Sequence, residues 1–186
     1  TATPIPRTLG LTLYGDLDVS IVDQLPMGRG RIRTFVRAQK DLPKIFKFVR
    51  EKLGEGRQAY FVYPRLEEGD LAQGLRAVKQ EAEALRKTLS PFSVGVLHGR
   101  MSAADKEAVM QAFRNNEIQA LAATLVIEVG VDVSNASLMV IENAEQFGLA
   151  QLHQLRGRIG RGKHESYCIL VSQGKTAEAK ERLKVM

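Results

Sequence analysis

The sequence QLHQLRGRIGRG at residues 151–162 combines apolar side chains with amides and guanidiniums at helical spacing. At 3.6 residues per turn these side chains separate into two neighbouring faces, one of Gln151, Gln154, Arg158 and Arg161 and one of Leu152, Leu155 and Ile159. The spacing therefore predicts a helix over residues 148–159 that packs one face and presents polar groups on the other.

Two glycines, Gly157 and Gly160, lie among the arginines, although each costs a helix interior roughly 1 kcal/mol relative to alanine. Either the helix ends there or another part of the molecule approaches that backbone closely. A packed scaffold with forked, permanently charged donors suits the charge that develops on a phosphoryl group in transfer. Arg158 and Arg161 are therefore candidate catalytic residues. The structural alternative is a solvated, arginine-rich helix end beside the negative pole of the helix dipole.

Composition is typical of one soluble globular domain, with 186 residues, 44% apolar and 26% charged. The net charge of +6 favours an anionic partner, nucleic acid first, although many other proteins are equally basic. The single cysteine, Cys168, excludes an internal disulfide framework, and in the run YCILV it is expected to be a small buried hydrophobe. We expect no metal site of the chain's own. Without a membrane-length apolar run or a leader sequence, we also expect a cytoplasmic protein that contacts no membrane.

From residue 32 onward, short apolar runs alternate with amphipathic stretches of helical length. The runs predict strands at residues 32–36, 59–63, 94–97, 118–122, 138–141 and 167–171, and the stretches predict helices at about 41–53, 71–89, 103–115, 148–159 and 175–185. This alternation predicts an α/β fold with a mainly parallel central sheet flanked by helices. Ser102, three residues before Asp105, is a candidate N-cap. Residues 1–31, with scattered prolines and glycines, read as a lead-in.

Ligands of open α/β sheets bind at the carboxyl ends of the strands, so the loops after the apolar runs are candidate sites. Tyr63 could meet nucleic acid there, although a strand that simply ends at Pro64 is an equally good reading. After the third run, His98, Gly99 and Arg100 are candidate DNA-backbone contacts because glycine allows close approach and arginine binds phosphate. A lone histidine is also often structural.

After the fourth run, the sequence TLVIEVGVD at residues 124–132 carries three candidate binding residues. Thr124 offers a hydroxyl to a phosphate, Gly130 permits unusual backbone angles, and Asp132 can accept from a ribose hydroxyl or a facing arginine. The alternative is a loop whose Asp132 caps the following turn.

The residues Gln154, Gly157, Arg158, Gly160 and Arg161 resemble the sixth conserved motif of superfamily 2 helicases, whose two arginines contact ATP phosphates. The longer run at residues 141–162 resembles the RecG family of bacterial branched-DNA helicases. The resemblance covers nearly the whole chain and implies a RecA-like three-layer domain, the second half of a two-part motor. It further implies that Gln154 and the two arginines complete an ATP site from across a cleft.

The same resemblance implies roles for other residues. Residues 124–132 look like the fifth motif, in which Thr124 contacts the DNA backbone while Gly130 and Asp132 lie near the nucleotide. The run LHGRM at residues 97–101 supports the DNA-backbone reading of that loop. Thr1 and Thr3 resemble the third motif and, with Gln151, are expected to couple nucleotide state to DNA contact. Two positions depart from the family pattern: Leu125 replaces a second threonine and Ser134 a proline.

The family pattern implies a division of the chain at residue 31. Residues 1–31 would be a lead-in from the first motor domain, and residues 32–186 would be the second RecA-like domain, ending before most of the family's translocation segment. No Gly-x-x-x-x-Gly-Lys-Ser/Thr string occurs, so the chain alone should not hydrolyse ATP. ATP phosphates and Mg²⁺ would bind mainly to the absent first domain. The expected partners are that domain, a wedge domain and branched or forked DNA.

Three other functions stay open at this point. The motor of the transcription-repair coupling factor shares the run QLHQLRGR. A stand-alone DNA-binding module would use the basic surface without meeting ATP. A degenerate regulatory domain would have no effect on ATP hydrolysis.

Overall fold

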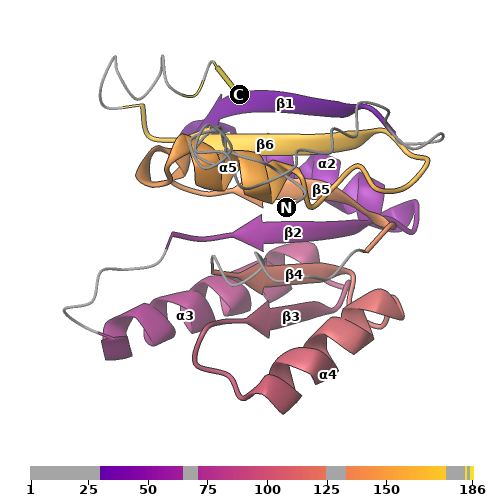
Figure 1. Ribbon diagram of the computed structural model, residues 1–186, viewed down its shortest axis with the longest axis vertical. Helices are drawn as coiled ribbons and strands as arrows, with labels where there is room; N and C mark the ends of the chain where they lie inside the picture. The colour runs from indigo at the N-terminus through magenta and orange to yellow at the C-terminus, as the bar shows by residue number, and fades with distance from the viewer. Residues whose placement is uncertain (1–29, 65–70, 125–132, 175–182, 184) are drawn as a thin grey trace, which may run out of the picture.

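A computed structural model describes residues 30–64, 71–124, 133–174, 183 and 185–186. Its centre is one six-stranded sheet in the order β1-β6-β5-β2-β4-β3, with every neighbouring pair parallel (Figure 1). The strands are β1 (Ile32–Ala38), β2 (Gln58–Val62), β3 (Val94–Leu97), β4 (Ala120–Ala123), β5 (Ala136–Ile141) and β6 (Ser166–Ser172). The prediction of a parallel sheet is confirmed.

Helices cover both faces of the sheet, as predicted. They are α2 (Leu42–Gly54), α3 (Leu71–Leu89), α4 (Ala103–Arg114) and α5 (Leu149–Arg156), with short 3₁₀ turns η2 (Gln39–Asp41) and η4 (Ala144–Gln146). One apolar cluster joins α2 and α3 to the sheet, and a second joins α4 and α5 to its other face. This is the three-layer, RecA-like arrangement. Most of the helix expected at residues 175–185 lies outside the described residues.

Burial explains why the strands read as continuous apolar runs. Every residue of β2, β4 and β5 is buried, which is expected of parallel strands covered on both faces. β1 lies at the sheet edge and has no buried residue, and its Arg33 is paired to Glu165 at 2.6 Å. Such charges on an edge strand discourage further strand pairing.

Two smaller predictions are also confirmed. Ser102 caps α4, since its hydroxyl accepts a hydrogen bond of 3.1 Å from the backbone N–H of Asp105. Cys168 is fully buried, and this burial raises the pKa of its thiol to about 12. No described helix has both the length and the apolar content needed to cross a membrane.

Candidate nucleotide and nucleic-acid sites

The arginines of residues 151–162 lie beyond the end of α5. The predicted helix over 148–159 is wrong at its C-terminus, because α5 ends at Arg156 with Gly157 as its C-cap. The last hydrogen bonds tighten, with Arg158 N–H donating to Leu155 O at 2.9 Å. Gly160, four residues beyond the end of α5, adopts φ +76°, a left-handed conformation that glycine takes readily. The arginines therefore do not share a helical face with the glutamines. We call residues 157–162 the arginine turn.

Close packing of backbone explains the glycines in this turn. A Cβ added to Gly160 would lie 2.5 Å from Ile32 Cγ1, and one added to Gly162 would lie 2.3 Å from the carbonyl oxygen of Ser134. Gly162 O also accepts a hydrogen bond of 2.8 Å from Gly30 N–H. Both explanations offered by the sequence thus hold, because the helix ends here and other segments approach the backbone.

The side chain of Ile159 anchors the arginine turn in the core, whereas its two arginines are partly exposed. Ile159 is 2% exposed, whereas Arg158 and Arg161 are half-buried. Arg161 Nε donates to Gly157 O at 3.2 Å, which holds the guanidinium against the end of α5. This hydrogen bond therefore restricts where the guanidinium of Arg161 can lie.

The two predicted glutamines lie on α5 itself. Gln154 is partly exposed in the last turn. Gln151 Oε1 accepts a hydrogen bond of 3.0 Å from Gly148 N–H, so its amide caps the start of the helix. Gln151 thus fixes where α5 begins.

The predicted DNA-binding residues gather at the carboxyl ends of β2, β4 and β3. Tyr63 N–H donates to Ala123 O at 2.9 Å, and Thr124 N–H donates to Leu97 O at 3.3 Å, which places His98 on the next strand along. These residues form what we call the carboxyl edge. The arginine turn, Ser134 and Gly30 instead precede β6, β5 and β1 and form the amino edge. Among the described residues, the structure separates the predicted DNA-binding residues from Arg158 and Arg161.

The loop after β3 is an exposed part of the carboxyl edge. Gly99 and Arg100 are exposed, and Met101 N–H closes a turn onto His98 O at 3.2 Å. Lys106 Nζ donates to Gly99 O at 2.9 Å from the first turns of α4. This loop can therefore present a guanidinium and backbone N–H groups to an anion.

The ring of Tyr63 does not belong to that surface. Tyr63 is 6% exposed and packs within the apolar cluster of α2 and α3. The pKa of its hydroxyl is raised mainly by burial and further by the nearby charge of Glu142. Stacking on a base would need this ring to be exposed, so Tyr63 lies beneath the edge.

Glu142 was missed by the sequence reasoning. It directly follows β5, is 8% exposed, and its N–H donates to Val62 O at 2.9 Å. Burial, followed by the nearby charge of Glu81, raises the pKa of its carboxyl to about 7. Its position after the apolar run at 138–141 was the available signal, since a carboxyl group that directly follows a buried strand can itself be buried, and burial raises its pKa.

Several predicted residues cannot be placed. Gly130, Asp132, Thr1 and Thr3 lie outside the described residues, as does Leu125. Of the run at residues 124–132, only Thr124 is described, and it lies at the carboxyl edge.

The arginine turn comes close to a phosphate-binding loop in sequence but not in context. Gly157, Gly162 and Lys163 match the spacing Gly-x-x-x-x-Gly-Lys, yet His164 stands where a hydroxyl residue is needed to hold Mg²⁺. The run also leads from a helix into a strand, the reverse of the strand-to-helix order of such loops. It is not a P-loop.

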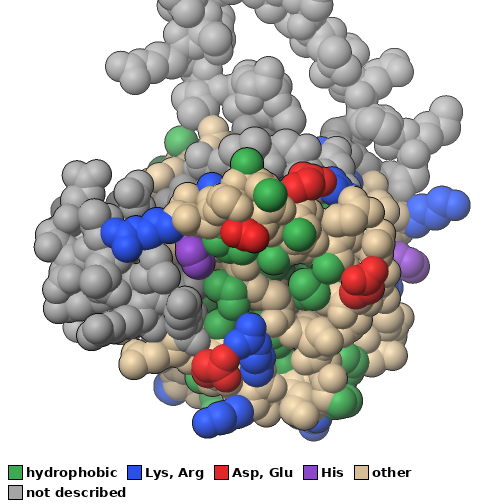
Figure 2. Space-filling model, turned by 90° about the horizontal axis from the view of Figure 1, so that it is seen from below, with side chains coloured by type: hydrophobic (Ala, Val, Ile, Leu, Met, Phe, Trp, Pro, Cys, Tyr) green, Lys and Arg blue, Asp and Glu red, His purple; other side chains and the backbone are tan. Residues whose placement is uncertain are grey.

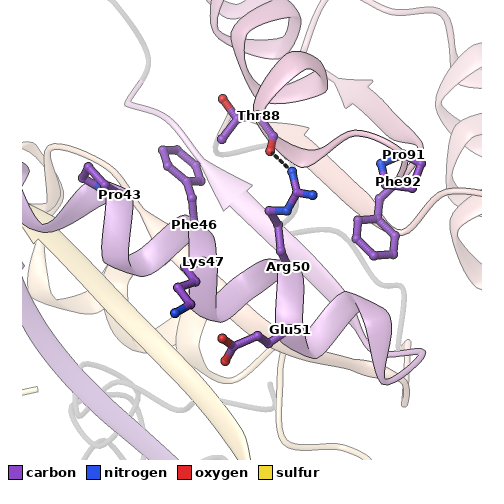
Figure 3. Close-up of a pocket in the computed structure, with 8 residues that line it drawn as sticks. All are labelled: Pro43, Phe46, Lys47, Arg50, Glu51, Thr88, Pro91 and Phe92. Atoms are coloured by element: carbon purple, nitrogen blue, oxygen red, sulfur yellow. Dashed lines mark hydrogen bonds between the residues drawn. The ribbon is translucent and has the colours of Figure 1, made fainter.

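A groove of about 760 Å³ lies on the face of the sheet that α2 and α3 cover, between α2 and the turn after α3 (Figure 3). Phe46 and Phe92 line it, and its charges have both signs, from Lys47, Arg50 and Glu51. Arg50 Nη1 donates to Thr88 O at 2.8 Å across it. Seen from the α4 side, acidic and basic side chains are likewise interspersed rather than gathered (Figure 2). Neither the groove nor the surface in Figure 2 therefore forms a basic patch.

Comparison with known proteins identifies the family. The conserved pattern of the helicase conserved C-terminal domain matches residues 44–163. The chain is 51% identical over 186 residues to the ATP-dependent DNA helicase RecG of Synechocystis sp., covering 100% of this chain and 22% of that protein. It is 45% identical over 186 residues to RecG of Bacillus subtilis, covering 100% of this chain and 27% of that protein. The chain thus spans about a quarter of the length of these relatives.

Solved structures agree in fold. A structure of RecG bound to a three-way DNA junction matches with a TM-score of 0.80 and 43% identity, covering 98% of this chain and 24% of that one. The helicase MrfA bound to DNA matches with a TM-score of 0.60 at 19% identity, covering 84% of this chain and 21% of that one, which supports the fold alone. The chain therefore belongs to the helicase conserved C-terminal domain family and is similar along its whole length to RecG.

Proposed function

We propose that this chain is the second motor domain of an ATP-dependent branched-DNA helicase that remodels replication forks and recombination junctions. Residues 1–31 would be the lead-in from the first motor domain, and residues 32–186 the second RecA-like domain. Similarity along the whole of this chain to part of the proteins named ATP-dependent DNA helicase RecG supports this, as does the likeness to RecG bound to a three-way junction. This similarity favours a RecG-type motor over that of the transcription-repair coupling factor.

The amino edge is the proposed nucleotide side. Arg158 and Arg161 would approach the γ-phosphate of ATP from across a cleft and stabilise its developing charge through their planar forks. Gln154, Gly130 and Asp132 would lie beside them. The first motor domain would hold the other phosphates and Mg²⁺, which supplies charge neutralisation there. Among the described residues, no group of three or more His, Cys, Asp or Glu could hold a metal ion.

The carboxyl edge is the proposed DNA side. Arg100 and the backbone around Gly99 would bind phosphates, and Thr124 would add a hydroxyl one strand away. His98 would shape this loop. Contacts of this kind fix a protein on DNA without reading sequence, which suits an enzyme that follows branched structure.

One observation supports the proposal: the arginine turn and the loop after β3 lie at opposite ends of the parallel strands. Closure on ATP would pull the amino edge toward the first domain, and a rigid sheet would move the carboxyl edge with it. Gln151, which fixes the start of α5, and Thr1 and Thr3 would take part in this coupling. Hydrolysis would release the arginines and reverse the movement.

A first experiment measures steady-state ATP hydrolysis by this chain alone with Mg²⁺ and saturating forked DNA. We expect no turnover because the chain has no P-loop. Turnover that persists after repurification would require a phosphate site of its own and would refute the half-motor assignment.

A second experiment tests the role of Arg158 in the intact protein. Arg158→Ala should lower turnover by on the order of 10³-fold while the salt dependence of DNA binding stays unchanged. A DNA-binding module that never meets ATP predicts the reverse, with the salt slope reduced by about 0.9 for each lost phosphate contact. A degenerate regulatory domain predicts no change in turnover.

A further inference from the structure

A hydrogen-bonded pair of amides, Gln58 and Asn135, lies at the amino edge behind the arginine turn. Asn135 Nδ2 donates to Gly56 O at 2.8 Å and to Gln58 Oε1 at 3.2 Å. In return, Gln58 N–H donates to Asn135 O at 3.2 Å. Three hydrogen bonds therefore join the residue that enters β5 to the turn that enters β2.

The Gln58 side chain is itself fixed from the other side. Gln58 is fully buried, and its Nε2 donates to Ile118 O at 2.8 Å and also to Phe113 O. Both amide hydrogens and the amide oxygen are thus used. A buried amide with all its groups satisfied holds one position, because any shift would leave a polar group unpaired.

The register of β5 changes at this point. Gln58 pairs with Ala136, but Ala59 pairs with Leu138, so Ser137 is an extra residue in the ladder. Ser137 is 3% exposed, and its hydroxyl has no hydrogen-bond partner within the described part of the chain. Bulges are rare between parallel strands and recur beside functional sites, where they redirect the chain. Here the bulge sets the path of residues 134 and 135.

That path determines where the arginine turn can lie. Ser134, next to Asn135, has its carbonyl oxygen against Gly162, with no room for a Cβ. Gly162 follows Arg161, whose Nε is held by Gly157 O at 3.2 Å. A movement of Ser134 would therefore be passed to Arg161 through one backbone contact, with Gly162, and the peptide bond that joins Gly162 to Arg161.

We propose that Asn135, held by Gln58, is a positioning residue for Arg161, setting through Ser134 and Gly162 where the guanidinium meets the nucleotide. This rests on the proposed role of the arginine turn. Misplacement of a catalytic group by about 1 Å can cost 10²-fold in rate, so a hydrogen-bonded support of this kind has a measurable effect on turnover.

The test uses the intact helicase that contains this chain. Asn135→Ala should lower DNA-stimulated kcat by about 10- to 100-fold, with little change in the KM for ATP or in DNA affinity. Asn115→Ala is the matched control, because it removes two exposed hydrogen bonds, with Gln111 at 3.0 Å and Glu117 at 3.1 Å, beyond α4 at the same edge. It should leave kcat unchanged. If Asn135→Ala fails to fold, Asn135→Asp, which keeps the shape but loses both donors, takes its place.

A double-mutant cycle with Arg161→Lys separates positioning from a general loss of structure. Arg161→Lys keeps the charge but loses the fork, so turnover should fall yet remain measurable. If Asn135 acts through Arg161, adding Asn135→Ala should lower kcat little further. Multiplied effects, or an unchanged kcat for Asn135→Ala, would overturn the positioning role alone. Full turnover by Arg161→Lys and by Arg161→Ala would overturn the arginine role, and positioning with it.

Discussion

The two edges of the sheet hold their functional residues by different means. At the carboxyl edge, Tyr63 and Thr124 continue the strand ladder, with hydrogen bonds to Ala123 and Leu97. At the amino edge, the arginine turn is fixed by glycines in contact with the backbone of Ser134 and with Ile32. The first arrangement follows from any parallel sheet, whereas the second depends on a few positions where no side chain fits. The amino edge should therefore be more sensitive to substitution.

The largest expected effect on stability comes from α5, which carries the chain between the edges. Leu155 is fully buried between α5 and the sheet, so Leu155→Ala should lower the free energy of unfolding by about 2–5 kcal/mol. Leu149→Ala, on the same helix at 39% exposure, should cost under about 1 kcal/mol. Urea denaturation of this chain measures both. Equal losses would mean that α5 is not anchored as described.

At the carboxyl edge, Glu142 should make stability depend on pH. Its folded pKa of about 7 is raised from 4.5, so the folded state binds more protons between these values. The contribution of protonated Glu142 to the free energy of unfolding is therefore fully present below pH 4.5 and is lost as the pH rises through 7. Relative to Glu142→Gln, the wild type should lose up to about 3 kcal/mol between pH 4.5 and pH 8. Parallel urea titrations at both pH values measure the difference, and a constant difference would contradict the buried position of Glu142.

At the amino edge, adding one methyl group should have opposite effects on stability at Gly162 and at Gly54. Gly162→Ala places a Cβ against the backbone of Ser134 and should cost about 1–3 kcal/mol in stability. Gly54→Ala, at the end of α2 with nothing within 4 Å of the added Cβ, should be neutral or stabilise by up to about 1 kcal/mol. Thermal unfolding of the two variants compares them. If both were neutral, the close approach at Gly162 would be refuted.

The smallest expected effect is at the start of α4. Ser102→Ala removes the N-cap and should cost about 1 kcal/mol, and Ser102→Thr should restore most of it. Because the loop at 98–101 runs into this cap, DNA affinity of the intact protein should fall slightly in the first variant only. A large loss of affinity would mean that the Ser102 hydroxyl, which also donates to Asp105 Oδ2 at 2.7 Å, contacts DNA directly.

The sequence predicts the carboxyl edge well because general rules govern it. Continuous apolar runs mark buried parallel strands, and the residue after each run lies at the same edge. His98 and Thr124 could be placed in this way. The same rule places Glu142, the residue after β5, at this edge. It could not show that the ring of Tyr63 packs inward, since that depends on the helices above it.

The amino edge was only partly predictable. The glycines among the arginines signalled that a helix ends or that backbone comes close, but helical periodicity continued the helix to residue 159. Ile32 and Ser134, which occupy the space beside Gly160 and Gly162, are far from them in sequence. The Asn135 and Gln58 contact was equally out of reach, because no local pattern marks an amide that will meet another across strands.

The most direct test compares two single substitutions in the intact protein, one at each edge. Arg161→Ala should reduce ATP turnover by on the order of 10³-fold, with DNA affinity and its salt slope unchanged. Arg100→Ala should weaken DNA binding and reduce the salt slope by about 0.9, with full turnover at saturating DNA. That result would establish separate nucleotide and DNA edges. The opposite result, with Arg161→Ala weakening DNA binding while turnover at saturating DNA is retained, would contradict the account.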